Sequence, residues 1–147
     1  MPEIKTIVVI GGTGHFGGRI CRRLLGEPNT RLVVTSRSKK RAQTLVAELR
    51  CGDARHDIKA TALDHSSPEF ETDLRALNPD LVIHTAGPYQ GQDYRVARAC
   101  IDCHAHYIDL ADGREFVEGF NQLNSEAQNS GYYWFPEPAL YRDCPVL

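Results

Sequence analysis

The sequence predicts an α/β fold in which a doubly wound parallel sheet lies between helices on both faces, in three layers of α/β/α type. The first observation is an unbroken apolar run at residues 7–10, typical of a strand covered on both faces. The second is a glycine-rich stretch at residues 11–18, which leads into a segment with helical spacing of apolar residues. The third is that strand-like and helix-like patterns alternate along the remaining chain, as they do in parallel sheets.

The first half of the chain contains the clearest element boundaries. We expect a strand at residues 4–10, a helix that ends near Gly26, and a second strand at residues 31–36. Ser38 is placed to cap the next helix, in which the apolar residues form one stripe. A polar loop at residues 51–57 then precedes a third strand. These boundaries predict two consecutive strand–helix units.

The pattern continues through the second half. The third strand is expected at residues 58–63, and the serine, proline and acid at residues 66–69 are typical of a helix start. A fourth strand at 81–85 is followed by a loop at 86–92. The remaining expected elements are a helix around 94–101, a strand at 107–110, a helix at 114–130 and a sixth strand at 132–135.

Composition and charge limit the classes of function. The chain has 147 residues, 41% hydrophobic and 24% charged, which suits one globular domain. Its formal net charge of -2 gives no electrostatic case for a nucleic-acid partner. We see no leader and no apolar run of membrane-spanning length, and we expect a cytoplasmic protein without a membrane partner. The five cysteines are then expected to be reduced thiols.

The glycine-rich stretch reads GGTGHFGG, so Gly12, Gly14 and Gly17 form the pattern G-x-G-x-x-G between a buried strand and a helix start. We expect Gly12 to allow the sharp turn, Gly14 to let a pyrophosphate approach the backbone, and Gly17 to let the helix pack closely. The N–H groups at the helix start would hold the phosphates. The alternative is a purely structural glycine turn. We predict a nucleotide-binding, Rossmann-like domain.

The end of the second predicted strand indicates which nucleotide is bound. Members that bind NAD carry an acidic residue here, which takes the ribose hydroxyls. This chain has Ser36, Arg37 and Ser38 instead, followed by three further basic residues. An arginine can hold a 2′-phosphate through two N–H donors. We therefore predict NADP(H) as the cofactor in preference to NAD(H), the alternative being that the basic cluster is only a solvated helix start.

Two further segments at the ends of strands are candidate cofactor contacts. Asp64 follows the third strand and is a candidate for the adenine edge, or equally a loop or helix-capping aspartate. Ala86, Gly87 and Pro88 follow the fourth strand and are expected near the nicotinamide ribose. The alternative for Gly87 and Pro88 is that they are ordinary turn residues without a role in binding.

Other motifs do not support a catalytic assignment. Residues 100–104 read C-x-x-C-H, which matches a haem attachment string, and a nearby histidine could suggest zinc, but only one C-x-x-C is present. We expect no metal site. Tyr94 is followed at the fourth position by Arg98 rather than by the lysine of short-chain dehydrogenases. The catalytic residues stay unassigned, although four polar residues are expected near the carboxyl ends of strands: His84, Tyr89, Asp109 and Asp112.

Three stretches carry a resemblance to a known family: GGTGHFGGRICRRLL, VVTSRS, and DLVIHTAGPYQGQDYRVARACIDCHAHYIDLADGREFV. They resemble the N-terminal NAD(P)-binding domain of the saccharopine dehydrogenase family, over roughly residues 5–131. The resemblance implies hydride transfer with a nicotinamide cofactor, often at a carbon–nitrogen bond. It implies three groups of cofactor contacts: Gly12, Thr13, Gly14, His15, Phe16 and Gly17 at the pyrophosphate; Ser36 and Arg37 at the adenosine ribose; and Ala86, Gly87 and Pro88 near the nicotinamide.

The resemblance also sets the expected domain organisation. We expect an NAD(P)-binding domain at residues 1–131 and a divergent aromatic tail at 132–147, with no substrate domain in this chain. The expected function is the NADP(H)-binding domain of a saccharopine dehydrogenase-like oxidoreductase. The alternatives are a non-catalytic dinucleotide-binding or redox-sensing module, a truncated pseudoenzyme, and a reductase with a minimal site on its own loops. A second copy of the chain is an expected partner, through the sheet edge or the tail.

Overall fold

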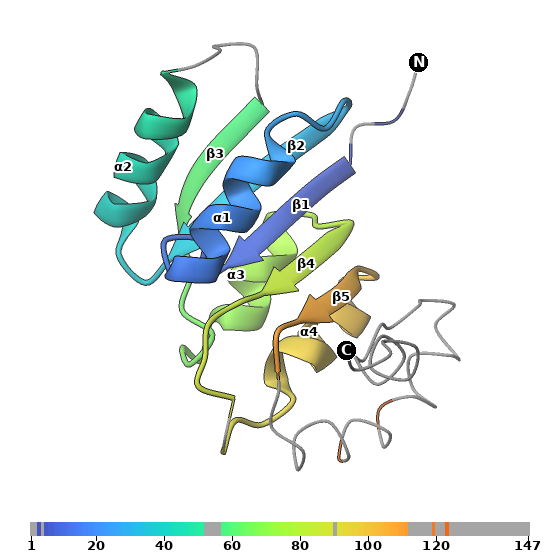
Figure 1. Ribbon diagram of the computed structural model, residues 1–147. Coiled ribbons are helices and arrows are strands. Elements are labelled where there is room, and N and C mark those ends of the chain that lie inside the picture. The colour runs from blue at the N-terminus through green and yellow to red at the C-terminus, as the bar shows by residue number, and fades with distance from the viewer. Residues whose placement is uncertain are drawn as a thin grey trace, which may run out of the picture.

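The computed structural model describes residues 3, 5–51, 57–89, 91–111, 119 and 123. In this part of the chain, five parallel strands form one sheet in the order β3-β2-β1-β4-β5, with helices on both faces (Figure 1). The strands are β1 (Lys5–Ile10), β2 (Thr30–Ser36), β3 (Asp57–Ala62), β4 (Leu81–His84) and β5 (His106–Asp109). The helices are α1 (His15–Leu24), α2 (Lys39–Arg50), α3 (Phe70–Ala76) and α4 (Arg95–Asp102). The predicted doubly wound parallel sheet is confirmed.

The central strand β1 is buried on both faces, because alternate side chains of a strand point to opposite sides. Val9 belongs to a cluster with Cys21 of α1 and Leu45 of α2. Val8 belongs to a second cluster with Leu74 of α3 and Cys100 of α4. Helices α1 and α2 therefore cover one face of the sheet, and α3 and α4 cover the other.

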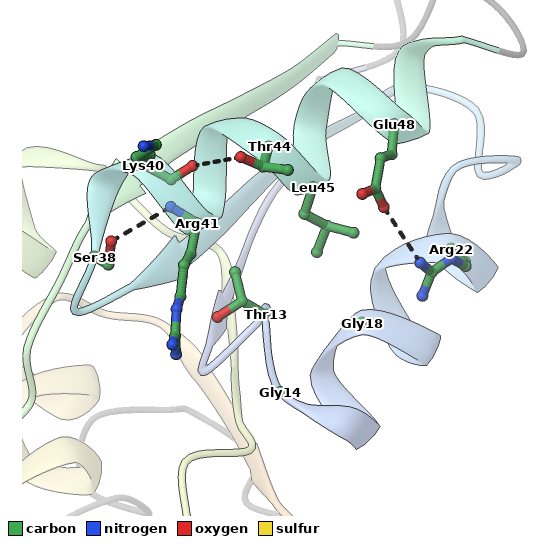
Figure 2. A pocket seen from close by; sticks show the side chains of 10 residues that line it. All are labelled: Thr13, Gly14, Gly18, Arg22, Ser38, Lys40, Arg41, Thr44, Leu45 and Glu48. Atoms are coloured by element: carbon green, nitrogen blue, oxygen red, sulfur yellow. Dashed lines mark hydrogen bonds and ion pairs between the residues drawn. The ribbon is translucent and has the colours of Figure 1, made fainter.

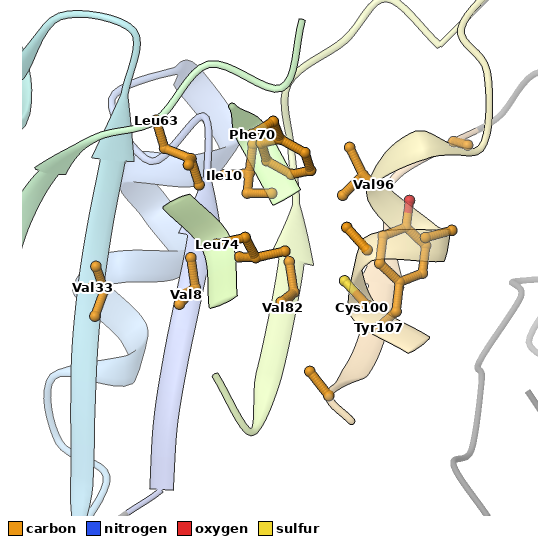
Figure 3. Packing of buried hydrophobic residues seen from close by; sticks show 14 of the residues in the cluster. Val8, Ile10, Val33, Leu63, Phe70, Leu74, Val82, Val96, Cys100 and Tyr107 are labelled. Atoms are coloured by element: carbon orange, nitrogen blue, oxygen red, sulfur yellow. The ribbon is translucent and has the colours of Figure 1, made fainter. Parts of the chain in front are cut away.

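Figure 3 shows the second cluster, in which Phe70 and Leu74 lie over the side chains of β1 and β4. Val96 of α4 lies beside this group, close to Tyr107 of β5. The buried residue Leu123, far along the chain, also packs in this cluster. The two faces of the sheet thus have separate apolar cores.

Most expected boundaries agree with the structure within two residues, but the start of α3 does not. The expected helix start at residues 66–69 is a turn, and α3 begins at Phe70. The Ser67 hydroxyl donates to Glu69 Oε2 at 2.6 Å and accepts from the Glu69 N–H at 3.2 Å. These local bonds hold the serine in the turn, and α3 has no side-chain cap.

Some expectations fall on residues that are not described. The helix at 114–130, apart from two of its residues, the sixth strand at 132–135 and the tail at 132–147 lie outside the described residues. Asp112, one of the polar residues predicted near the strand ends, lies outside them too. No helix in the described part of the chain has the length and apolar character needed to cross a membrane.

Candidate functional site

All strands are parallel, so the loops after β1, β2 and β4 meet at the carboxyl-terminal edge of the sheet. Backbone hydrogen bonds attach the loop after β1 to both neighbouring strands. The Gly12 N–H donates to the Thr35 carbonyl of β2 at 2.9 Å, and the Thr85 N–H donates to the Ile10 carbonyl at 2.9 Å. The glycine loop therefore has a defined position before any ligand arrives.

The first two glycines of this loop have different structural roles. Gly11 has φ = +76°, a left-handed conformation that favours glycine, and it makes the turn out of β1. A Cβ atom on Gly12 would lie 2.9 Å from Val34 Cγ1, so Gly12 is required by close packing against β2. The expectation that Gly12 makes the sharp turn is wrong, because the positive φ belongs to the residue before it.

Gly17 permits the close approach of α1, as the sequence pattern predicts. A Cβ atom at this position would overlap the Gly11 carbonyl oxygen and would lie 2.7 Å from Thr85 Oγ1. Helix α1 thus packs directly on the glycine loop and on the residue after β4. Any side chain at Gly17 would move the helix start away from the sheet edge.

The start of α1 is available to an anion. Gly14 is the residue before the first turn, no side chain accepts a hydrogen bond there, and the first turn has no acidic residue. The first N–H groups of a helix have no partner inside the helix, and they carry its positive dipole end. A Cβ atom on Gly14 would meet only the Gly11 carbonyl oxygen within 4 Å, at 3.2 Å, so the backbone is open to approach. His15 and Phe16 are exposed beside it and contact each other edge to face.

The end of β2 is joined to the glycine loop by a hydroxyl network. The Thr13 hydroxyl donates to Ser36 Oγ at 3.1 Å, and the Ser38 N–H donates to the same oxygen at 3.2 Å. Since Ser36 accepts both bonds, its own hydroxyl hydrogen is left to donate to a ligand. Ser38 Oγ accepts from the Arg41 N–H at 3.4 Å and caps α2, as predicted.

A cavity of about 550 Å³ lies between α1 and α2. Figure 2 shows Arg41 descending from α2 toward the loop that carries Thr13, while Lys40 turns away from that loop. On the other side of the cavity, Arg22 Nη2 lies 3.8 Å from Glu48 Oε2. The lining residues are Thr13, Gly14, Gly18, Arg22, Ser38, Lys40, Arg41, Thr44, Leu45 and Glu48. With three basic residues and one acidic residue, this lining favours an anion.

Arg37 and Asp64 lie outside the lining of this cavity. Arg37 is exposed and does not belong to the lining of the cavity. Asp64 Oδ1 accepts from the Ser66 hydroxyl at 2.6 Å and from the Ser66 N–H at 3.0 Å. These bonds lower the pKa of Asp64, with smaller contributions from His65 and Arg37. Asp64 therefore has the local role of a loop aspartate, and its contact with adenine stays a prediction.

The loop after β4 lies against the glycine loop. The Thr85 hydroxyl donates to the carbonyls of Ile10 and Gly11, at 2.8 and 3.2 Å. A Cβ atom on Gly11 would lie 3.0 Å from the Ala86 nitrogen. Gly87 and Pro88 follow, exposed and joined by a cis peptide bond. The two loops predicted to hold opposite ends of one ligand are thus in contact.

The titratable residues beneath this loop are largely buried. His84 pairs in register with Asp109, and the Tyr89 hydroxyl donates to the His84 carbonyl at 2.6 Å. Burial lowers the pKa of His84 to about 4 and raises the pKa of Asp109. Burial also raises the pKa of the Cys100 thiol, which packs in the core. Within the described residues, no three His, Cys, Asp or Glu side chains form a group that could hold a metal ion.

Of the ten lining residues, the sequence assigns Thr13, Gly14 and Ser38 to the site and misses the other seven: Gly18, Arg22, Lys40, Arg41, Thr44, Leu45 and Glu48. In the sequence, Arg41 is one of a run of basic residues. Its position three residues after the predicted cap Ser38, in the first turn of α2, was a usable signal. Arg22 and Thr44 gave no such signal, since they reach the cavity only because α1 and α2 lie side by side.

Comparison with known proteins places this site in context. The model of a family described as "Saccharopine dehydrogenase NADP binding domain" matches residues 7–139. No curated protein sequence matches the chain. Among solved structures, apo saccharopine dehydrogenase (L-Glu forming) from Saccharomyces cerevisiae has a TM-score of 0.68 at 17% identity, over 88% of this chain and 26% of that one.

Two further structures extend the comparison. A short-chain dehydrogenase from Sphingobium yanoikuyae in complex with NADPH has a TM-score of 0.62 at 17% identity, over 88% of this chain and 68% of that chain. L-Sorbose reductase from Gluconobacter frateurii, complexed with NADPH and L-sorbose, has a TM-score of 0.67 at 13% identity, over 88% of this chain and 66% of that chain. At these identities the similarity concerns the fold. The chain spans about a quarter of the yeast enzyme.

Proposed function

This chain belongs to the family of saccharopine dehydrogenase NADP-binding domains, and we propose that it binds NADP(H) in preference to NAD(H) along the sheet edge described above. As a member, it is a Rossmann-like domain that binds a nicotinamide dinucleotide. The observation that carries the preference for the phosphorylated form is the basic cavity between α1 and α2, with Arg41 directed into it.

The glycine loop supplies the proposed pyrophosphate site. Gly14 leaves the backbone open where the first N–H groups of α1 emerge, and Gly12 and Gly17 keep the loop and helix in close contact. The Thr13 backbone lies between these glycines, while its hydroxyl is held by Ser36. His15 and Phe16 stand exposed on the ligand side of the first turn.

The end of β2 and the start of α2 supply the proposed 2′-phosphate site. Ser36 has a hydroxyl hydrogen left to donate, and Ser38 lines the cavity. Arg41 provides a guanidinium group directed at the same space. Arg37, exposed outside the cavity lining, remains a proposed contact of the adenosine ribose. No carboxylate stands at the end of β2, where it would repel a phosphate.

The loop after β4 supplies the proposed site for the other half of the cofactor. Ala86, Gly87 and Pro88 extend from the glycine loop along the sheet edge. Asp64 remains a proposed contact for the adenine edge. When bound, a nicotinamide dinucleotide supplies hydride chemistry, and we propose hydride transfer as the reaction of the enzyme to which this domain contributes its cofactor site.

A titration of the pure protein with NADPH and NADH, followed by the fluorescence of the reduced nicotinamide, tests this proposal. Arg41→Ala is expected to weaken NADPH binding about 10- to 100-fold, because it removes a charge-assisted hydrogen bond. Its effect on NADH should be less than about twofold. Lys39→Ala is the matched control, since it removes the same charge from an exposed residue of the same helix that does not line the cavity.

The comparison of the two variants separates a direct contact with the phosphate from a general effect of positive charge. Equal weakening by Arg41→Ala and Lys39→Ala would mean that net charge alone attracts the ligand. Wild-type protein that binds NADH as tightly as NADPH would overturn the proposed preference. Wild-type protein that binds neither would refute the proposed function of this chain.

A further inference from the structure

Gln92 holds the loop after β4 from beneath. Its Nε2 group donates hydrogen bonds to the Ala86 carbonyl at 3.0 Å and to the Pro88 carbonyl at 2.5 Å. Its backbone N–H donates to the Tyr89 carbonyl at 3.1 Å, which closes the turn. A single half-buried side chain thus contacts both ends of the segment 86–88.

His84 fixes the orientation of the Gln92 amide. Gln92 Oε1 lies 3.3 Å from His84 Nε2, while the amide nitrogen faces the two carbonyls. A rotated amide would direct its oxygen at two carbonyl oxygens and would lose both bonds. The arrangement requires a hydrogen on His84 Nε2, since the glutamine oxygen can only accept.

The burial of His84 keeps its imidazole neutral, with a hydrogen on only one ring nitrogen. The side chain is 1% exposed, and burial lowers its pKa to about 4, so it is neutral near pH 7. With the hydrogen on Nε2, Nδ1 keeps a lone pair that accepts no hydrogen bond from the described residues. A buried acceptor without a hydrogen bond lowers the free energy of unfolding. The contact between Nε2 and Gln92 therefore carries a stability cost at Nδ1.

A second anchor holds the same loop from the side of β5. The Tyr89 hydroxyl donates to the His84 carbonyl at 2.6 Å and accepts from the Leu110 N–H at 3.4 Å. Tyr89 thereby joins the ends of β4 and β5 beneath the loop. Gln92 controls the exposed segment 86–88, whereas Tyr89 holds the strand ends under it.

We propose that Gln92 is a positioning residue, which shapes the segment 86–88 to receive the nicotinamide half of the dinucleotide. This inference rests on the proposed function and deepens it. The bonds from Gln92 hold two carbonyls beneath the loop and leave Gly87 and Pro88 exposed at the edge. Within the part of the chain that the structure describes, Gln92 makes no contact with the lining of the cavity between α1 and α2, so we expect the adenosine half to bind without its help.

This separation makes the proposal testable with two ligands. NADPH extends over both halves of the site, whereas adenosine 2′,5′-bisphosphate carries the adenosine and the 2′-phosphate without the nicotinamide. Gln92→Met keeps the length of the side chain and removes every side-chain hydrogen bond, while the backbone bond to Tyr89 stays. Gln92→Glu keeps the shape and replaces the donor with an acceptor. Gln43→Met, at an exposed position on α2 outside the cavity lining, is the control substitution.

Both variants of Gln92 are expected to weaken NADPH binding about tenfold, since each loses two hydrogen bonds that shape the loop. Binding of the bisphosphate should change less than twofold, and Gln43→Met should alter neither ligand. If the Gln92 variants bound NADPH and the bisphosphate more weakly by the same factor, Gln92 would only support the fold. If their affinities for NADPH and the bisphosphate were those of the wild type, Gln92 would not shape the nicotinamide side. Either result overturns the inference. Failure of the wild type to bind either ligand refutes the proposed function as well, which distinguishes the two failures.

Discussion

Of the two glycines in α1, Gly17 leaves less room for a side chain. A Cβ atom there would overlap the Gly11 carbonyl oxygen and would lie 2.7 Å from Thr85 Oγ1 and 2.8 Å from Gly12 Cα. The two glycine neighbours are backbone atoms of a loop that is hydrogen-bonded to β2 and β4, so they do not move aside independently. Gly17→Ala is therefore expected to push α1 away from the glycine loop.

The free-energy change follows from three contributions. Forcing an extra methyl group into a packed site costs about 1–3 kcal/mol. Disturbing one hydrogen bond of the Thr85 hydroxyl adds about 1 kcal/mol. Alanine is favoured over glycine inside a helix by about 1 kcal/mol, which offsets part of this. The expected net destabilisation is about 1–3 kcal/mol, or a fall in Tm of roughly 3–10 °C.

Gly18→Ala is the matched control, because it lies next to Gly17 in the same helix. A Cβ atom at Gly18 would lie 3.3 Å from Arg22 Nη1, the far end of an exposed side chain, and 3.7 Å from the Gly12 carbonyl oxygen. It gains the same helix preference without an overlap, so it should be neutral or stabilising by up to about 1 kcal/mol. Urea and thermal unfolding of the two variants measure the difference. If they unfold at the same denaturant concentration and temperature, close packing is not the reason for glycine at position 17.

Two further predictions concern a buried base and an exposed acid. The pKa of His84 falls from its ordinary value of 6.5 to about 4, so the unfolded chain takes up a proton first as the pH falls. The free energy of unfolding should decline from pH 6.5 toward pH 4, by up to about 3 kcal/mol. In urea unfolding measured at several pH values, His84→Gln should make this free energy less dependent on pH. An unchanged pH dependence in the variant would exclude His84 as its source. Glu48→Gln removes the acid from the cavity lining and should strengthen NADPH binding about threefold at low salt, with less than about 0.5 kcal/mol change in stability. The exposed Glu27→Gln, away from the cavity, is its control, and equal effects of the two substitutions in the titration would argue for general charge.

Much of the fold was predictable because buried parallel strands have a simple signature. The apolar run in β1 requires cover on both faces, and the alternation of patterns requires crossover helices. The start of α3 was wrong because Ser67 and Glu69 form bonds within the turn itself, which a capping pattern does not distinguish. Local competition of this kind depends on backbone geometry that the residue types do not specify.

The candidate site was predictable where residues lie close together in sequence. The glycine loop and Ser38 follow from short patterns, although the pattern could not assign the left-handed turn to Gly11 because two glycines are adjacent. The direction of Arg41 depends on how α2 lies over the glycine loop, which is a tertiary property. The role of Gln92 depends on a buried histidine eight residues earlier, and no periodicity connects such a pair.

The separation of the two apolar cores has a consequence for cooperativity. The loop after β2 and the cavity are supported by α1 and α2, whereas the loop after β4 is supported by the core beneath α3 and α4. Between the cores stand the strands, with β1 contributing to both. A dinucleotide that lies along the edge contacts loops belonging to each core, and its binding energy opposes the opening of either one. The ligand would thus oppose local opening on both faces, and we expect amide exchange on opposite faces of the sheet to slow together when it binds.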